Sequence, residues 1–201
     1  SVVPVVRPDG TRVERDETVR PSLTAADLGR FGPAFAQLGA MGPDAFVLKS
    51  APALGNVEHV HCVAHCPPIA DGAALALLGS EQRGRELGLK PRARIAAFAE
   101  LNADPLQPFE AGFVAFRRVL ERAGIGADEL GAIEFMEAFA AVPARFLRTY
   151  PELAERTNES GGHLAMGHPM GASGAVLVAT LLAEMERKDV EWGLAVAHAV
   201  S

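Results

Sequence analysis

Several features are scarce in this chain of 201 residues, and each absence excludes a class of protein. Two Cys are too few for a disulfide-stapled scaffold. No apolar run approaches the roughly 18 residues of a membrane span, and the first residues lack the pattern of a secretory leader. Asp and Glu (25) outnumber Lys and Arg (19), so the basic surface of a nucleic-acid-binding protein is missing. We therefore expect a cytoplasmic protein with no membrane span and no nucleic-acid partner.

Aromatic residues make up only 6% of the chain, so the core must rely on Ala, Leu and Val. Apolar runs typical of buried strands alternate with helical patterns from residue 71 onward. The predicted strands are 73–78, 94–99, 132–135 and 192–198, and the predicted helices are 80–87, 111–123, 137–149 and 171–188. Before them we expect a strand at 2–6 and a helix at 24–35 capped by Thr24. This alternation predicts an α/β fold with a mostly parallel or mixed sheet.

A glycine-rich segment from Asn158 to Ala175 carries the strongest chemical signal. Its glycines allow a tight turn and a close approach of a ligand to the backbone. His168 lies in the loop just before an apolar helix, where a histidine can act as a base or donate a hydrogen bond to a developing oxyanion. The spacing alone is equally compatible with a structural histidine in a glycine-rich loop.

The segment Gly161–Ala175, with Gly167-His168-Pro169 at its centre, resembles the GHP signature of thiolases, the acyl-CoA C-acyltransferases. Three further segments agree with that family in order and spacing. Ile69–Ala74 resembles "NDGAAA", Glu134–Ala140 resembles "EXNEAFA", and Trp192–His198 resembles "YGLATLC". The resemblance implies the C-terminal half of a thiolase, a mixed sheet flanked by helices, at 71–201. Part of the family's loop domain would precede it at 1–70.

The resemblance also implies a chemistry. In thiolases a nucleophilic Cys of the N-terminal half takes the acyl group from a CoA thioester, with no bound cofactor and no metal. His168 would activate that Cys and bind the thioester oxygen. Gly167, Met136 and His163 would line the oxyanion site and pocket, and His65 and Ser173 would contact the substrate.

Several positions depart from the family pattern. Met136 replaces the Asn that holds an oxyanion-site water, and a thioether cannot donate a hydrogen bond. His198 replaces the second, acid/base Cys; imidazole can take a proton near neutral pH. His65 replaces another Asn, Pro67 replaces a Ser near the pantetheine, and Val200 replaces a Gly. Two hypotheses remain open: part of an acyltransferase with His168 and His198 as catalytic residues, or a non-catalytic subunit that binds acyl-CoA or stabilises a partner.

The chain starts abruptly and stops within a strand-like run, so we expect it to be completed by an N-terminal thiolase half or a partner chain, in a homo- or hetero-oligomer. The last strand of its own sheet is also expected to be missing. Without them, an apolar helix layer and an unpaired sheet edge would be exposed.

A cluster of His and Cys residues between 59 and 66 admits three interpretations. Zinc takes such ligands, a Cys62–Cys66 disulfide is conceivable, and a substrate-lining or structural loop needs neither. An extended segment would put the histidines and the cysteines on opposite faces, which splits the ligand set. We favour the loop and predict no metal site.

Overall fold

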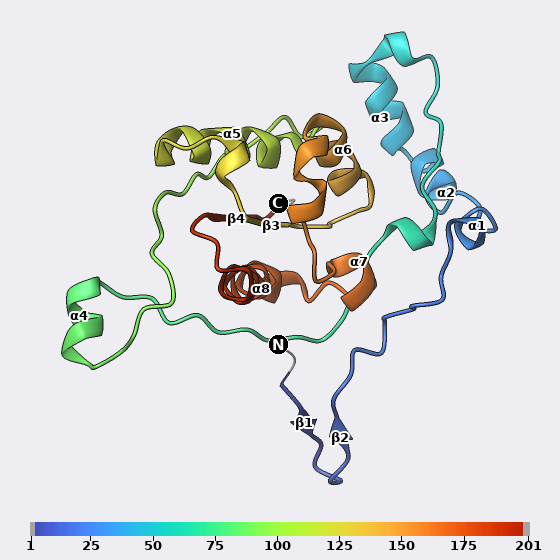
Figure 1. Ribbon diagram of the computed structural model, residues 1–201. Coiled ribbons are helices and arrows are strands. Elements are labelled where there is room, and N and C mark those ends of the chain that lie inside the picture. Colours follow the sequence, from blue (N-terminus) through green and yellow to red (C-terminus); the bar gives the residue numbers. More distant parts are fainter. Residues whose placement is uncertain (1–2, 199–201) are drawn as a thin grey trace.

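The computed structural model describes residues 3–198. Two parallel strands form its centre, β3 (Ala132–Phe135) and β4 (Gly193–Val196), with Ala132 opposite Gly193 and Phe135 opposite Val196. Helices α5 (Glu110–Ala123) and α6 (Ala141–Thr149) cover one face of this pair. Helix α8 (Ser173–Lys188) covers the other face (Figure 1). The α/β architecture expected from the sequence is confirmed.

The core lies between this pair of strands and helices α5 and α6. All four residues of β3 are buried, as expected for an apolar run packed on both faces. Helix α5 contributes Phe113, Phe116 and Leu120, which share one helical face. It ends at Gly124, whose φ of +73° is the left-handed conformation that glycine adopts without strain.

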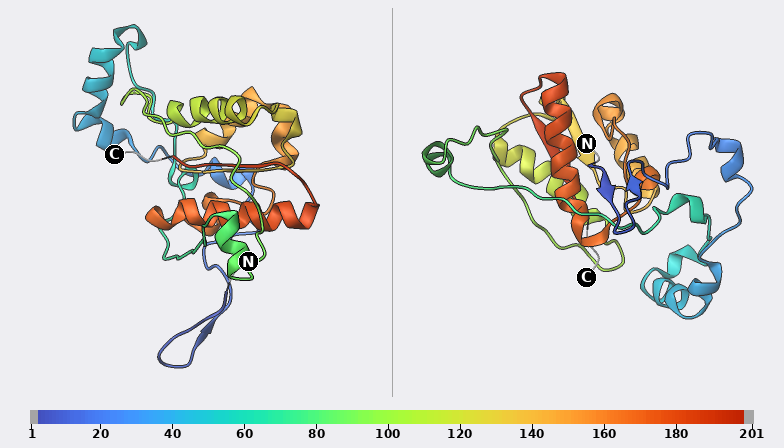
Figure 2. Two further views of the ribbon diagram at one scale, coloured as in Figure 1. Left: turned by 90° about the vertical axis from the view of Figure 1, so that its left-hand side faces the viewer. Right: turned by 90° about the horizontal axis from the view of Figure 1, so that it is seen from below.

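The remaining elements are short. A hairpin pairs β1 (Val5–Val6) with β2 (Arg12–Val13). The other helices are α1 (Ala25–Leu28), α2 (Ala36–Ala40), α3 (Pro43–Ser50), α4 (Glu81–Glu86) and α7 (His163–Met166). Short 3₁₀ helices occupy Pro52–Leu54, Val63–His65, Ala127–Glu129, Pro151–Arg156 and Met170–Ala172. The hairpin and the α2–α3 pair stand away from the core (Figure 2).

Local capping signals proved reliable. Ser80 caps α4 through a 3.2 Å hydrogen bond from the N–H of Arg83. Thr24 and Asp27 form a reciprocal capping box at α1, yet the helix ends at Leu28 instead of the predicted Phe35. Likewise α6 begins at Ala141, four residues after the predicted start.

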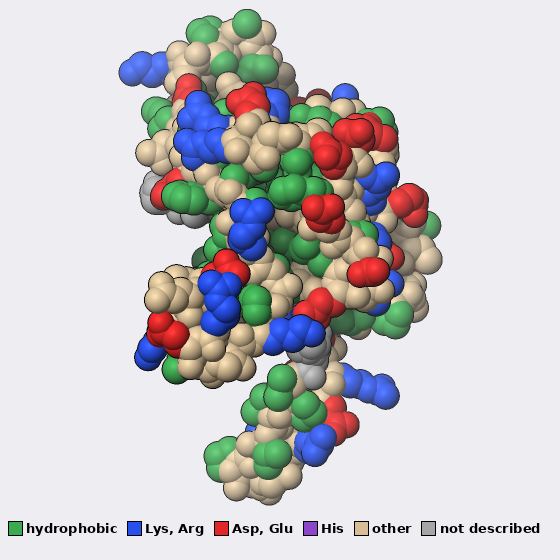
Figure 3. Space-filling model, turned by 60° about the vertical axis from the view of Figure 1, so that its left-hand side comes forward, with side chains coloured by type: hydrophobic (Ala, Val, Ile, Leu, Met, Phe, Trp, Pro, Cys, Tyr) green, Lys and Arg blue, Asp and Glu red, His purple; other side chains and the backbone are tan. Residues whose placement is uncertain are grey.

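Two predicted strands are wrong: 73–78 and 94–99 are extended but hydrogen-bond to no neighbouring strand within residues 3–198. Their side chains are exposed, Leu75 to 94% and Phe98 to 74%. An apolar run forms a strand only where another backbone supplies its hydrogen bonds. Figure 3 turns the side carrying α4 forward and shows apolar side chains gathered between charged groups.

The ends of the predicted strands at 2–6 and 192–198 differ from the prediction. Pairing begins at Val5 and ends at Val196, while Val2 and residues 199–201 lie outside the described residues. The expected missing last strand therefore stays a prediction, as does the domain boundary at residue 70. In the described part of the chain, no helix combines the length and the apolarity needed to cross a bilayer.

Candidate functional site

The loop that carries His168 is clamped against the segment before residue 73. The backbone N–H of His168 donates to the carbonyl of Pro68 at 2.8 Å. Gly167 has a φ of +92°, and a Cβ there would lie 2.6 Å from the Cβ of Ala70. At Gly72 a Cβ would lie 2.8 Å from the Cβ of Pro169. The two glycines are therefore required for the close approach that holds His168 in place.

The imidazole of His168 is oriented by the first residue of α8. Its Nδ1 shares a 2.8 Å hydrogen bond with the hydroxyl of Ser173, which is only 1% exposed. His168 itself is half-buried. Because Nδ1 is engaged, Nε2 is the nitrogen left for chemistry. Ser173, predicted to contact substrate, faces His168 in this arrangement.

His163 lies against His168 from the helix α7. The two ring centroids are 5.2 Å apart and the rings are nearly perpendicular, at 88°. His163 is 3% exposed, and neither ring nitrogen has a hydrogen-bond partner among the described residues. Burial, and then the charge of His168, lower the pKa of His163 below its ordinary value.

The glycine-rich loop is tied to the end of β3. Asn158 caps the strand, accepting the N–H of Phe135 at 2.8 Å and donating to its carbonyl at 2.8 Å. The carboxylate of Glu137 accepts from Asn158 Nδ2 and from the N–H of Leu164, each at 2.9 Å. A Cβ at Gly162 would lie 2.3 Å from that carboxylate. These contacts hold the Glu134–Ala140 segment beside the loop of His168.

Met136 and His198 form a second pair. The backbone N–H of His198 donates to the Sδ of Met136 at 3.1 Å, and both residues are buried. The His198 ring lies 5.3 Å from that of Phe135 and directly over Gly112 of α5, where a Cβ would lie 1.9 Å from its Cε1. Burial lowers the pKa of His198 to about 4, so the ring is neutral at pH 7. Its Nε2 has no partner in the described residues.

The His/Cys cluster does not gather around one point. His59 pairs with Asp44 at 2.9 Å, and the carbonyl of His65 accepts from the N–H of Ala140 at 2.8 Å. Cys62 and Cys66 are free thiols. Within residues 3–198, no three His, Cys, Asp or Glu side chains are placed to share a metal ion. The interpretation of this segment as a loop beside the site stays a prediction.

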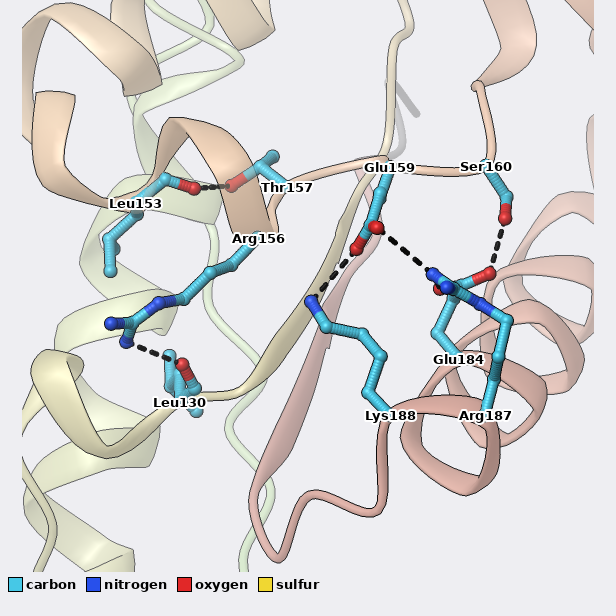
Figure 4. A network of polar contacts seen from close by, with 9 residues as sticks. All are labelled: Leu130, Leu153, Arg156, Thr157, Glu159, Ser160, Glu184, Arg187 and Lys188. Carbon is cyan, nitrogen blue, oxygen red and sulfur yellow. Dashed lines mark hydrogen bonds and ion pairs between the residues drawn. The ribbon is translucent and has the colours of Figure 1, made fainter.

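A polar network anchors the segment that leads into the glycine-rich loop (Figure 4). Glu159 pairs with Arg187 at 3.0 Å and with Lys188 at 2.8 Å, both at the end of α8. Ser160 bonds Glu184, which also pairs with Arg187. These contacts fix the loop at the end opposite His168.

A buried carboxyl, that of Glu134, lies close enough to this network to be affected by the charge of Glu184. Glu134, in β3, is 3% exposed. Burial, followed by the charges of Glu184 and Glu137, raises its pKa to about 8. Glu134 and Gly112 are not among the site residues predicted from the sequence. An acidic residue inside an apolar strand and a glycine inside a helical pattern are the signals that single them out.

The predicted site residues thus form two groups. His168, His163, Ser173 and Gly167 share the glycine-rich loop, while Met136 and His198 meet at the ends of β3 and β4. Glu137 and Asn158 join the loop to the segment that carries Met136. His65 is attached to the same segment through its backbone.

Comparison with known proteins gives a consistent result. Residues 89–200 match the family model described as "Thiolase, C-terminal domain". A 3-ketoacyl-CoA thiolase of Escherichia fergusonii is 39% identical over 183 residues, 90% of this chain and 42% of that protein. Those of Shigella flexneri and Klebsiella pneumoniae subsp. pneumoniae are 38% and 37% identical with the same coverage. The chain therefore spans about two fifths of the length of the curated relatives it matches.

Proposed function

The chain belongs to the thiolase family, and we propose that it is the C-terminal part of an acyl-CoA C-acyltransferase of lipid metabolism, contributing His168 to the active site. The observation that carries this proposal is the GHP loop, which presents a half-buried His168 held through Nδ1 by Ser173. The similar proteins are named 3-ketoacyl-CoA thiolases, which supports an acyl-CoA thioester as substrate, with a second acyl-CoA as acceptor in the forward direction and CoA as acceptor in the reverse direction. No bound cofactor is required.

In the proposed reaction, a Cys in the part of the protein that this chain does not span attacks the thioester carbonyl. Nε2 of His168 takes the thiol proton and then faces the oxyanion of the tetrahedral intermediate. The intermediate collapses to an acyl-Cys thioester, and CoA leaves with a proton. A second acyl-CoA, whose α-proton passes to a base of the site, then attacks the acyl-Cys carbonyl through its α-carbon. A carbon–carbon bond forms, the carbon–sulfur bond to the Cys breaks, and the Cys thiolate takes back a proton. Gly167 contributes to the reaction indirectly. Its positive φ and its lack of a side chain allow the loop to pack against Ala70, and this packing holds His168 in place.

The second pair gives the site an unusual oxyanion region. The sulfur of Met136 already accepts the N–H of His198, so we assign it to lining the pocket. His198 is neutral at working pH and offers Nε2 as a hydrogen-bonding group or weak base near the substrate α-carbon. His163 and His65 complete the lining from α7 and from the 62–67 loop.

The alternative function is a non-catalytic thiolase-like subunit that binds acyl-CoA or stabilises a partner chain. The replacement of a hydrogen-bond donor by Met136 favours it, since removal of one oxyanion donor costs on the order of 10²–10³ in rate in a well-studied protease. Under either function we propose a cytoplasmic homo- or hetero-oligomer that includes an N-terminal thiolase half.

The deciding experiment replaces His168 in the full-length protein. We expect His168→Ala to lower the rate at which CoA cleaves a 3-ketoacyl-CoA by about 10²–10⁴-fold, the usual contribution of a positioned acid/base group. The control is His61→Ala, since His61 is exposed and outside the site. An unchanged rate in His168→Ala would rule out a catalytic role for His168. A wild-type protein with no acyl transfer above background, but with acyl-CoA binding retained in calorimetry, would establish the non-catalytic function instead.

A further inference from the structure

His163 is a buried imidazole that the proposed reaction does not use. It is 3% exposed, and both ring nitrogens lack partners among the described residues. Buried polar atoms in folded proteins are nearly always hydrogen-bonded, so an exception calls for an explanation. An apolar side chain would fill the same space without leaving two polar atoms unpaired. What distinguishes His163 from such a side chain is its contact with His168.

The contact with His163 restricts rotation of the His168 ring about its hydrogen bond to Ser173, a rotation that this bond does not prevent. The 2.8 Å hydrogen bond between Nδ1 and the Ser173 hydroxyl holds that nitrogen but permits the ring to rock about the bond. His163 meets the same ring at 88° with centroids 5.2 Å apart, the edge-to-face geometry that aromatic rings prefer. Together the two contacts determine where Nε2 of His168 points.

The same closeness couples the charges of the two imidazoles. Two cations at this separation repel each other, so the second proton binds less readily than the first. Burial disfavours the charged form of His163 more than that of the half-buried His168. The pKa of His163 is accordingly below its ordinary value.

Few other titratable groups face His163. The Glu137 carboxylate, from the segment after β3, accepts the N–H of Leu164 and lies against Gly162. The other contacts of this region are uncharged: the Thr18 hydroxyl donates to the carbonyl of Ala165, and the carbonyl of Pro68 accepts from His168. Glu137 is thus the carboxylate that contacts the residues on either side of His163.

We propose that His163 is a positioning residue for His168: its ring meets the His168 imidazole edge to face and holds the plane of that ring. This inference rests on the proposed function of His168. It predicts that an aromatic ring at residue 163 preserves activity, and that removal of His168's charge changes the titration of His163.

The first test is an NMR titration of the full-length protein labelled on histidine rings. In His168→Asn the pKa of His163 should rise relative to wild type, because the repulsion from His168 is gone. The control is His61→Asn, since His61 contacts a different imidazole, that of His65, at 5.6 Å. An identical His163 titration in wild type and His168→Asn would overturn the proposed coupling.

The second test separates orientation from volume. His163→Phe keeps an edge-to-face ring, and His163→Leu keeps most of the volume without the ring. We expect kcat to stay within about threefold of wild type in the first and to fall about tenfold or more in the second, with KM unchanged, because misplacing a catalytic group is expensive. Equal kcat values for the two variants would overturn the positioning role. If His168→Asn itself retains full acyl transfer, the proposed function fails, whereas the titration still decides the coupling.

Discussion

The backbone N–H of His198 donates a hydrogen bond to the sulfur of Met136, 3.1 Å away, and joins the ends of β4 and β3. Both residues occupy positions where the thiolase resemblance leads one to expect other side chains, an Asn and a Cys. The two replacements are therefore in direct contact. A thioether at one position and an imidazole at the other form a buried pair, so the effect of each replacement depends on the other.

The ring of His198 fills the space over Gly112, so a methyl group added by Gly112→Ala should destabilise the protein. A Cβ there would lie 1.9 Å from Cε1 of His198, so the ring or the helix must move. We expect a loss of about 1–3 kcal/mol in the free energy of unfolding, typical of overpacking a buried site. Chemical denaturation of the full-length protein measures it.

A matched control and a double substitution sharpen this prediction. Gly84 lies in α4 with nothing within 4 Å of its Cβ position, so Gly84→Ala should stabilise by about 0.5–1 kcal/mol through helix propensity alone. Adding His198→Ala should remove most of the cost of Gly112→Ala. If the double variant loses as much stability as the sum of the two single variants, the contact is not the cause.

The sulfur of Met136 serves as a hydrogen-bond acceptor, and Met136→Leu should reveal its contribution. Leu has a similar volume but leaves the buried N–H of His198 without a partner. We expect the free energy of unfolding to fall by about 1 kcal/mol. Met170→Leu is the control, because Met170 is 60% exposed. A Met136→Leu protein as stable as wild type would show that packing alone holds this pair.

Glu134 should make stability depend on pH. Its pKa is raised in the folded protein to about 8 from 4.5, so the folded state keeps a proton that the unfolded state loses. The stabilisation is complete below about pH 4.5 and is lost as the pH rises toward 8, by up to about 1.4 kcal/mol per pH unit. Urea denaturation at pH 5, 6.5 and 8 measures the slope.

The isosteric variant Glu134→Gln cannot ionise, so its stability should vary less than that of wild type across the same window. The control Glu191→Gln changes an exposed carboxylate and should leave the slope unaltered. Parallel slopes for wild type and Glu134→Gln would contradict the assignment.

Local signals in the sequence were enough for the elements that form by themselves. Ser80 caps α4 through a contact with residues only a few positions away. Gly124 ends α5 because glycine readily adopts the left-handed backbone conformation found there. The contact of His198 with Gly112 depends on how α5 packs against β4, which no local pattern reveals. Motif resemblance located His168, but the roles of Ser173 and His163 as its neighbours emerged only from the folded geometry.

The two extended segments 73–78 and 94–99 show what a pattern cannot specify. Their apolar composition predicts strands, but a strand also needs a neighbouring backbone, which these segments do not find within residues 3–198. We expect hydrogen exchange to reveal that neighbour in the full-length protein. Amides of both segments should exchange rapidly in this chain alone and at least about tenfold more slowly in the full-length protein, because hydrogen-bonded amides are protected.

The internal references for that measurement are β3 and the β1–β2 hairpin. The amide of Met136, which donates to the carbonyl of Val196, and that of Phe135, which donates to Oδ1 of Asn158, should be protected in both samples. Exposed backbone of the hairpin turn near Gly10 should exchange rapidly in both. Rapid exchange of 73–78 and 94–99 in the full-length protein would mean that their apolar side chains meet another surface without strand pairing. Protection in the full-length protein alone would instead show that these residues become strands when the rest of the protein supplies the pairing backbone.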